Sequence, residues 1–138
     1  MTVETNKSVI RRFTEFVNTA SERLAKELVA PEAVLHVSGR TERIRGPAGY
    51  LATIAMMRRG FPDINWTLEE MIAEGDKVAA RFTLRGTHRG SFYGVPATGE
   101  TIQVQAMAFY RLSSGQIVEE YGERDVLGML QQIGAAPD

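Results

Sequence analysis

The N-terminal part of the chain carries apolar residues at helical spacing. Steps of mostly three and four place them on one helix face: Val9, Ile10, Phe13, Phe16, Val17, Ala20, Leu24 and Leu28. Residues 18–21 interrupt the pattern and predict two consecutive helices rather than one. Thr5 or Asn6 is expected to cap the first helix, because either side chain can accept a hydrogen bond from a free backbone N–H. Pro31 is expected to end the second helix.

Residues 33–62 predict a strand followed by a third helix. Residues 33–39, AVLHVSG, alternate as a half-buried strand does. A turn-rich connector follows, and Gly46-Pro47 then favours a helix entry, since proline is tolerated in the first turn. Pro62 is expected to end this helical region.

The second half of the chain predicts antiparallel strands. Residues 64–88 contain two strand candidates divided by Glu74-Gly75-Asp76, a hairpin signal. The Gly- and Pro-rich residues 90–100 predict a loop, residues 101–112 and 116–125 two further strands, and residues 126–134 a short closing helix. Helices first and a meander afterwards favour an α+β fold with the helices on one face of a curved sheet. No linker or repeat interrupts residues 1–138, so a single domain is expected.

Composition and charge exclude several classes of function. The chain has 138 residues, 43% of them hydrophobic, and a formal net charge of -1, which gives no bulk attraction to nucleic acid or to an anionic membrane. It contains no cysteine and two histidines, which excludes thiolate chemistry and a three-histidine metal site. With no apolar run of membrane-spanning length and no apolar signal core, a cytoplasmic protein is expected.

Spaced motifs in the second half resemble the SnoaL-like polyketide cyclase family of the nuclear transport factor 2-like superfamily. They occur in the family's order: FPD at 61–63, EGDKV at 74–78, GTH at 86–88, then Gly94, Pro96, Thr98 and Gly99, and finally Asp125, LG at 127–128 and QQIG at 131–134. The resemblance covers residues 8–134 and implies a cone-shaped barrel, in which a strongly curved antiparallel sheet and N-terminal helices enclose a pocket. It also implies a small apolar ligand such as a polyketide-like compound, and a homodimer or higher homo-oligomer formed through the sheet.

The resemblance implies acid/base chemistry that uses no metal and no cofactor. In the family, an aspartate on the last strand exchanges the proton and a histidine on the neighbouring strand assists. Aligned through residues 113–118 and Asp125, the aspartate position falls on Gly122 and the histidine position on Ala108, and neither residue can carry a proton. Two functions therefore stay open: a cyclase, isomerase or hydrolase that uses another acid, or a non-catalytic ligand-binding or accessory protein. The two small residues are expected to enlarge the pocket for a bulkier ligand.

Period-two alternation selects the remaining candidates on the last strand. If Gly122 faces the pocket, Glu120 and Arg124 face it as well. Glu120 is the candidate general base, with Arg124 or His88 as its electrophilic partner. The structural alternative for Glu120 is an ion pair with Arg124 or Arg111.

The candidate ligand-binding residues come from several predicted strands: His36, Trp66, Ala108, Tyr110 and Gly122. For His36 the alternative is a locally satisfied strand histidine, and for Trp66 it is ordinary core packing. For His88 a hydrogen bond that pins the following loop is favoured over a catalytic role. Asp125 is expected to cap the closing helix.

Overall fold

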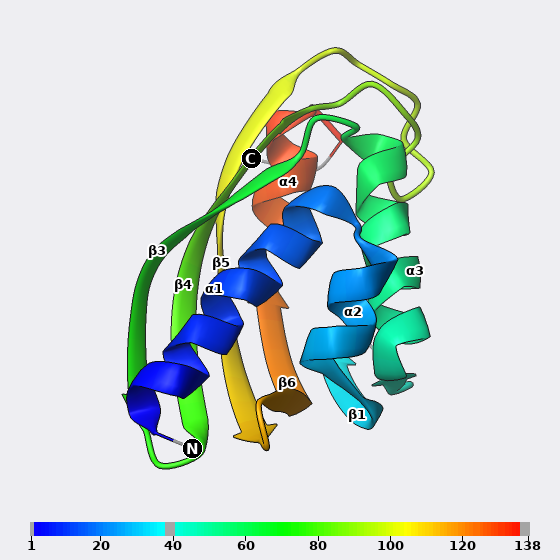
Figure 1. Ribbon diagram of the computed structural model, residues 1–138. Helices are drawn as coiled ribbons and strands as arrows, with labels where there is room; N and C mark the ends of the chain where they lie inside the picture. The colour runs from blue at the N-terminus through cyan, green and yellow to red at the C-terminus, as the bar shows by residue number, and fades with distance from the viewer. Residues whose placement is uncertain (1, 38–40, 136–138) are drawn as a thin grey trace.

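The protein folds as a curved sheet with helices packed against one of its faces (Figure 1). The computed structural model describes residues 2–37 and 41–135. Within these ranges the helices are α1 (Val3–Thr19), α2 (Glu22–Leu28), α3 (Gly46–Gly60) and α4 (Val126–Gln132). The strands there are β1 (Val29–Val37), β2 (Ile44–Arg45), β3 (Asn65–Glu74), β4 (Lys77–Thr87), β5 (Thr101–Ser113) and β6 (Gln116–Arg124). The predicted α+β fold is confirmed.

The predicted break between the first two helices is confirmed, and it lies at Ala20. This residue has a left-handed φ of 56°, which a right-handed helix cannot continue. The Ser21 hydroxyl then caps α2 by accepting the Leu24 N–H at 3.2 Å. Both helices bury the face that the spacing predicted, including Ile10, Phe13, Phe16, Leu24 and Leu28.

The N-cap predicted for α1 is wrong, because the helix begins earlier than its apolar face. Thr2 is the N-cap, and its hydroxyl accepts the Thr5 N–H at 3.1 Å. The Thr5 hydroxyl in turn accepts the Thr2 N–H at 2.9 Å, which completes a reciprocal capping box. Asn6 is buried inside the helix, where its amide donates to the Gly75 carbonyl at 3.4 Å.

β1 also begins earlier than predicted, at Val29, so Pro31 lies inside a strand instead of ending the region. The pairing of β1 with β6 shifts register between Val29 and Val34. A strand can accommodate proline at such an irregularity, because the missing N–H is not needed for the ladder there. The predicted continuation of this strand at Ser38 and Gly39 lies outside the described residues.

The sheet has the strand order β2-β1-β6-β5-β4-β3. The expected antiparallel arrangement is correct for the β3–β4, β4–β5 and β5–β6 pairs, but β1 runs parallel to β6, so the sheet is mixed. The reason is connectivity: β1 enters from α2, and only strands joined by a tight hairpin must be antiparallel. β2 and β3 are the edge strands, so the cone is closed by helices and not by sheet alone.

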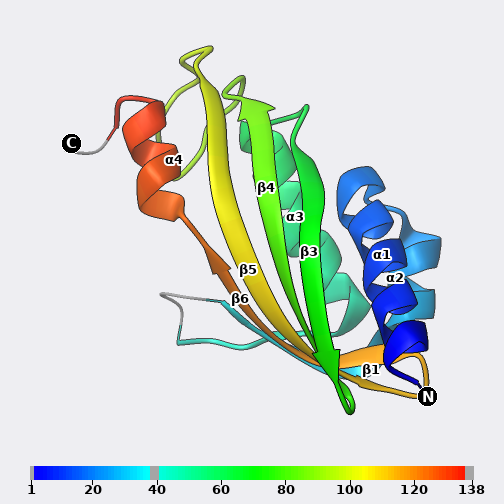
Figure 2. The same ribbon diagram turned by 90° about the vertical axis from the view of Figure 1, so that its left-hand side faces the viewer.

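The curvature of the sheet creates a concave face, and α1, α2 and α3 lie over that face (Figure 2). β5 alternates strictly between exposed and buried positions along its length. Its buried side chains point into the space under the helices, as the period-two pattern predicted. α4 packs near the start of β5, where Gln132 hydrogen-bonds the backbone of Gln103, and it buries Met129 and Ile133.

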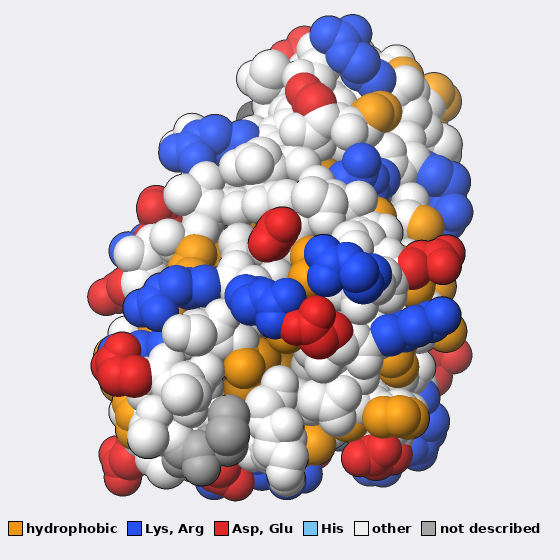
Figure 3. Space-filling model, viewed as in Figure 1, with side chains coloured by type: hydrophobic (Ala, Val, Ile, Leu, Met, Phe, Trp, Pro, Cys, Tyr) orange, Lys and Arg blue, Asp and Glu red, His pale blue; other side chains and the backbone are white. Residues whose placement is uncertain are grey.

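The surface agrees with the near-zero net charge of the sequence. Positive and negative side chains are interspersed on the face that carries α1 and α2 (Figure 3). Among the described residues, no helix is long and apolar enough to cross a membrane.

Candidate functional site

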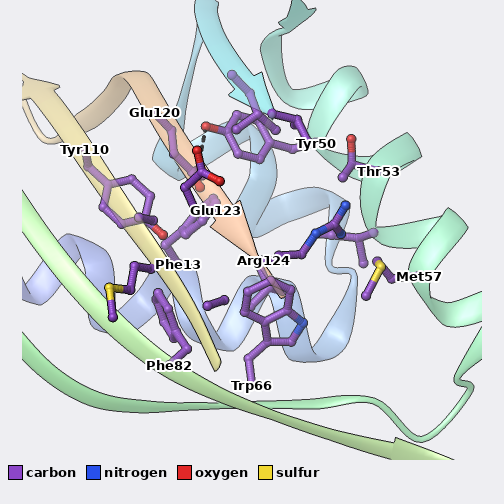
Figure 4. Close-up of a pocket in the computed structure, with 18 of the residues that line it drawn as sticks. Phe13, Tyr50, Thr53, Met57, Trp66, Phe82, Tyr110, Glu120, Glu123 and Arg124 are labelled. Atoms are coloured by element: carbon purple, nitrogen blue, oxygen red, sulfur yellow. Dashed lines mark hydrogen bonds between the residues drawn. The ribbon is translucent and has the colours of Figure 1, made fainter. Parts of the chain in front are cut away.

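A cavity of about 80 Å³ lies between the concave face of the sheet and helices α1 and α3. Most of its wall is apolar or aromatic and includes Phe13, Ile54, Met57, Trp66 and Phe82. Figure 4 shows side chains from both helices and from β3 to β6 converging on this space. A concave apolar site with a few polar groups is the usual form of a small-molecule site.

Ala108 and Gly122 form part of the cavity wall and lie directly opposite each other on β5 and β6. At this pair of positions, β5 and β6 therefore extend almost no side chain into the cavity. Tyr110 and Trp66 also line the cavity. Four of the five predicted ligand-binding residues are thus brought together, and the cavity beside Gly122 that the small residues predicted is present.

Glu120 places a carboxyl group in this apolar wall, with only 8% of the residue exposed. Its Oε1 accepts a hydrogen bond from the Tyr50 hydroxyl at 2.9 Å (Figure 4). Burial raises the pKa of Glu120 to about 7, while the Tyr50 hydrogen bond and the charge of Arg124 act in the opposite direction and are weaker. A carboxyl group with a pKa near neutrality can both take up and release a proton under physiological conditions.

The other carboxylate oxygen of Glu120 lies over Gly122. A Cβ at position 122 would be 3.1 Å from Glu120 Oε2, closer than an ordinary van der Waals contact. The missing side chain therefore provides the room in which the Glu120 carboxylate lies. With Oε1 held by Tyr50 and Oε2 against open cavity wall, the carboxylate has one constrained oxygen and one that a ligand can approach.

Two tyrosines flank Glu120. Tyr110 pairs with Glu120 across β5 and β6, and Tyr50 faces it from α3. Burial, followed by the charge of Glu120, raises the pKa of both phenols well above the ordinary value, so each remains a protonated donor at neutral pH. The Phe13 ring packs edge-on against Tyr50 and Tyr110, with centroid distances of 5.3 and 5.7 Å, and keeps both rings at the cavity.

Sequence reasoning missed Tyr50. The available signal was a single tyrosine on the apolar face of the third predicted helix, since a buried tyrosine requires a partner for its hydroxyl. That partner, Glu120, is 70 positions away in the sequence. Nothing in the local pattern of either segment identifies the other.

Arg124 lines the same cavity as Glu120, as the period-two alternation predicts, and Glu123 from the intervening position lines it too. Its side chain extends from β6 toward the Thr53 side of the cavity (Figure 4). The predicted alternative partner Arg111 is wrong, because its Nε lies 3.5 Å from Glu119 Oε1 on the opposite face of the sheet.

His88 does not line the cavity, so the structure does not support its predicted role as electrophilic partner. It is fully buried beside the loop that follows β4, and its Nδ1 lies 2.9 Å from Thr98 Oγ1. Nδ1 also accepts the Thr98 N–H at 3.2 Å, which makes it the unprotonated ring nitrogen. Its backbone N–H donates to Glu100, and its carbonyl accepts from Gly99. This geometry matches the favoured alternative, a histidine that pins the loop.

His36 likewise does not line the cavity, so the structure does not support its predicted ligand-binding role. Its neighbours Leu35 and Val37 point inward, so His36 points to the outer face of the sheet. There its Nε2 lies 3.0 Å from Glu119 Oε2, and its ring stacks on Tyr121 at a centroid distance of 4.2 Å. His36 is a locally satisfied strand residue.

The predicted N-cap at Asp125 is confirmed. Its Oδ1 accepts the Gly128 N–H at 2.8 Å at the start of α4. No group of three or more His, Cys, Asp or Glu side chains that could hold a metal ion occurs within residues 2–37 and 41–135.

Comparison with known proteins gives consistent matches across almost the whole chain. The sequence model of the SnoaL-like polyketide cyclase family matches residues 7–133. The aklanonic acid methyl ester cyclase DnrD of Streptomyces peucetius is 29% identical over 139 residues, covering 96% of this chain and 92% of that protein. The aklanonic acid methyl ester cyclase DauD of Streptomyces sp. (strain C5) is 29% identical over 133 residues, covering 91% of this chain and 80% of that protein.

Two solved structures share the fold and part of the sequence. IdmH from Streptomyces antibioticus is 32% identical with a TM-score of 0.82, and the match covers 94% of this chain and 98% of that chain. TsrD from Streptomyces laurentii is 26% identical with a TM-score of 0.84, covering 98% of each chain.

Proposed function

This chain belongs to the SnoaL-like polyketide cyclase family, and on that premise we propose that it cyclises a polyketide-like compound by acid/base chemistry inside the cavity. The observation that carries the proposal is the buried Glu120 carboxyl group, with Oε1 held by Tyr50 and Oε2 facing the space over Gly122. A hydrophobic wall with one positioned proton-transfer group suits a substrate that is mainly carbon skeleton with carbonyl groups.

In the proposed reaction, the Glu120 carboxylate removes a proton from the carbon next to a substrate carbonyl. The electron pair of that carbon–hydrogen bond is retained as an enolate, which then forms the new carbon–carbon bond at a second carbonyl group. The oxygen of the second carbonyl takes the proton back from Glu120. No atom is gained or lost, so the product is an isomer of the substrate, and no oxidant or reductant is required.

The developing enolate needs a hydrogen-bond donor, and we assign this role to the Tyr110 hydroxyl. Tyr110 is the cross-strand partner of Glu120, lines the same cavity and stays protonated at neutral pH. Arg124 lies four residues from Glu120 along β6, which is roughly 13 Å between the two Cα atoms. Its charge favours the ionised form of Glu120, whereas Tyr110 lies directly opposite Glu120 on the neighbouring strand.

The second candidate function is ligand binding without catalysis. It is favoured by one specific observation: Ala108 and Gly122, facing each other in the wall, contribute no polar side chain to the site. In that case Glu120 would only hydrogen-bond a ligand. The two functions predict the same cavity and differ in whether substrate turns over.

The two functions can be distinguished by testing turnover of aklanonic acid methyl ester, the compound in the names of DnrD and DauD. Aklanonic acid methyl ester is incubated with the wild-type protein, and the ring-closed isomer is measured by chromatography. Glu120→Gln is expected to bind the compound and to lose at least a hundredfold in kcat, which is the usual range for removal of a general base. Glu119→Gln is the matched control, since Glu119 is the adjacent glutamate on the outer face. Binding by the wild type with no turnover of this ester or of the corresponding free acid would support the binding function.

Two other sequence-based expectations stay predictions, namely a cytoplasmic location and a homo-oligomer. For the oligomer, we propose that two copies pair through the outer face of the sheet. Ile72, Phe109 and Tyr121 form part of one row across β3, β5 and β6, and all three are exposed, as is Met107 beside them. Exposed apolar side chains that lie together in this way are typical of an interface.

A further inference from the structure

A second hollow adjoins the cavity and shares part of its wall. Its volume is about 170 Å³, and its wall includes Ile44, Gly49, Ala52 and Met56 from β2 and α3. Val37, Thr53 and Arg124 line both this hollow and the cavity. The two spaces therefore meet at these three residues, which we call the junction.

Arg124 is the charged side chain of the junction. A guanidinium group has five N–H donors in a fixed planar fork, so a contact with the protein still leaves donors for a ligand. Thr53 cannot replace it as a donor, because its hydroxyl already donates to the Gly49 carbonyl at 3.0 Å. Val37 is apolar. Arg124 is thus the junction residue that can meet a negative charge.

We propose that the junction binds a carboxylate group of the ligand through Arg124. The ligand is then an elongated organic acid, with its apolar ring end beside Glu120 and its acid group at the junction. Glu120 and Arg124 are separated along the same side of β6, so the two ends of the ligand lie apart. The proposal deepens the proposed function because it rests on the same ligand cavity, but it requires no catalysis.

The carboxylate is the favoured chemistry because an arginine and a carboxylate can share two parallel hydrogen bonds. Charge-assisted hydrogen bonds of this kind are stronger than those to a neutral ester carbonyl. A preference of about tenfold or more for an acid over its methyl ester is expected from such a contact. The relatives DnrD and DauD are named for a methyl ester, so this preference would distinguish the present chain from them.

An acid and its methyl ester provide a matched pair of probes. Anthraquinone-2-carboxylic acid and its methyl ester share one flat apolar ring system and differ in charge. The chain contains a single tryptophan, and Trp66 lines the cavity, so quenching of its fluorescence reports binding there. Measurements are made at pH 6, below the pKa of about 7 of Glu120, so that Glu120 is mainly neutral and does not repel the acid.

The wild type is expected to bind the acid at least tenfold more tightly than the ester. Arg124→Met is expected to remove the preference by weakening acid binding, and Arg124→Lys to restore part of it. Arg111→Met is the control, because Arg111 lies on the outer face with Glu119, and it should keep the full preference. Thermal unfolding of each variant confirms that it is folded.

The proposal is overturned if the wild type binds the two probes equally, or if folded Arg124→Met retains the preference. The equal-binding outcome needs no variant. The same titration in Glu120→Gln separates the two proposals, since the acid preference should persist there while turnover is lost. Turnover without acid preference would contradict only the role of the junction, and acid preference without turnover would contradict only the cyclase function.

Discussion

The Oε2 atom of Glu120 lies 3.1 Å from the point that a Cβ of Gly122 would occupy. Both residues face the cavity from β6, two positions apart. A glycine at 122 therefore lets the longer glutamate side chain lie flat against the strand, with Tyr50 holding its other oxygen. The Glu120 carboxylate can occupy this position because residue 122 has no side chain.

Gly122→Ala is expected to displace the Glu120 carboxylate and to lower kcat by about tenfold, because a 1 Å misplacement of a catalytic group can cost up to a hundredfold. Gly122 does not have a positive φ, so the backbone accepts alanine without strain. The displaced atom is the end of a flexible side chain, so the free energy of unfolding should change little. Steady-state kinetics and urea unfolding on the same preparation test this. Unchanged kcat in the variant would show that Glu120 does not depend on the space at position 122.

The stability of the protein should fall as the pH rises from about 4.5 to about 7, compared with Glu120→Gln. In this window the unfolded chain has released the Glu120 proton and the folded protein has kept it, because burial raises the pKa to about 7. The wild type should lose about 3 kcal/mol relative to Glu120→Gln across this window, from 1.36 kcal/mol per pH unit. Outside this window, the difference in the free energy of unfolding between the two proteins should no longer change with pH. Urea unfolding of both proteins at pH 4 to 8 measures the difference, and parallel curves would contradict the raised pKa.

Tyr50→Phe should shift the pH dependence of turnover to higher pH. Glu120 acts as a base in its ionised form, so kcat/KM is expected to rise with pH and to level off above about 7. The Tyr50 hydrogen bond lowers the pKa of Glu120, and its removal leaves burial less opposed. The midpoint of the profile should therefore move upward. Tyr93→Phe, which removes the hydroxyl of an exposed tyrosine outside the cavity, is the matched control. An unmoved midpoint in Tyr50→Phe would argue against Glu120 as the titrating group.

His88→Ala should loosen the loop after β4 and leave the pH profile of turnover in place. The variant loses both hydrogen bonds between the ring and Thr98, and it removes a fully buried imidazole from its packing. A cost of about 2 kcal/mol in the free energy of unfolding follows. Hydrogen exchange at the Thr98 and Gly99 amides should accelerate in the variant. A moved pH midpoint with normal stability would instead indicate that His88 takes part in proton transfer.

Phe109→Glu should weaken the proposed pairing of two copies. Phe109 is 46% exposed, and its cross-strand partner on the outer face is Tyr121. A charge at this position cannot be buried in an apolar interface without a large penalty. Light scattering after size exclusion should show a dimer or larger oligomer for the wild type and a lower mass for the variant. A monomeric wild type would contradict this interface. Glu15→Gln serves as the control, because Glu15 is exposed on α1, which covers the other face of the sheet.

The hydrophobic pattern predicted most of the fold because helical and strand periods are local properties. The hairpin at Gly75, the alternating faces of β5 and the cap at Asp125 all lie where the pattern placed them. The direction of β1 could not be predicted in this way. Alternation is the same in parallel and antiparallel strands, so only the path of the chain out of α2 decides it.

The sequence by itself determined that Glu120, Gly122 and Arg124 alternate onto the inner side of β6 and that positions 108 and 122 are small. It could not decide which of its polar residues are neighbours. Only the tertiary structure joined Glu120 to Tyr50 from α3, placed His88 in a loop anchor and turned His36 to the outer face. The physical reason is that period determines the face of a side chain, whereas burial, hydrogen-bond partners and the resulting pKa depend on elements that meet only after folding.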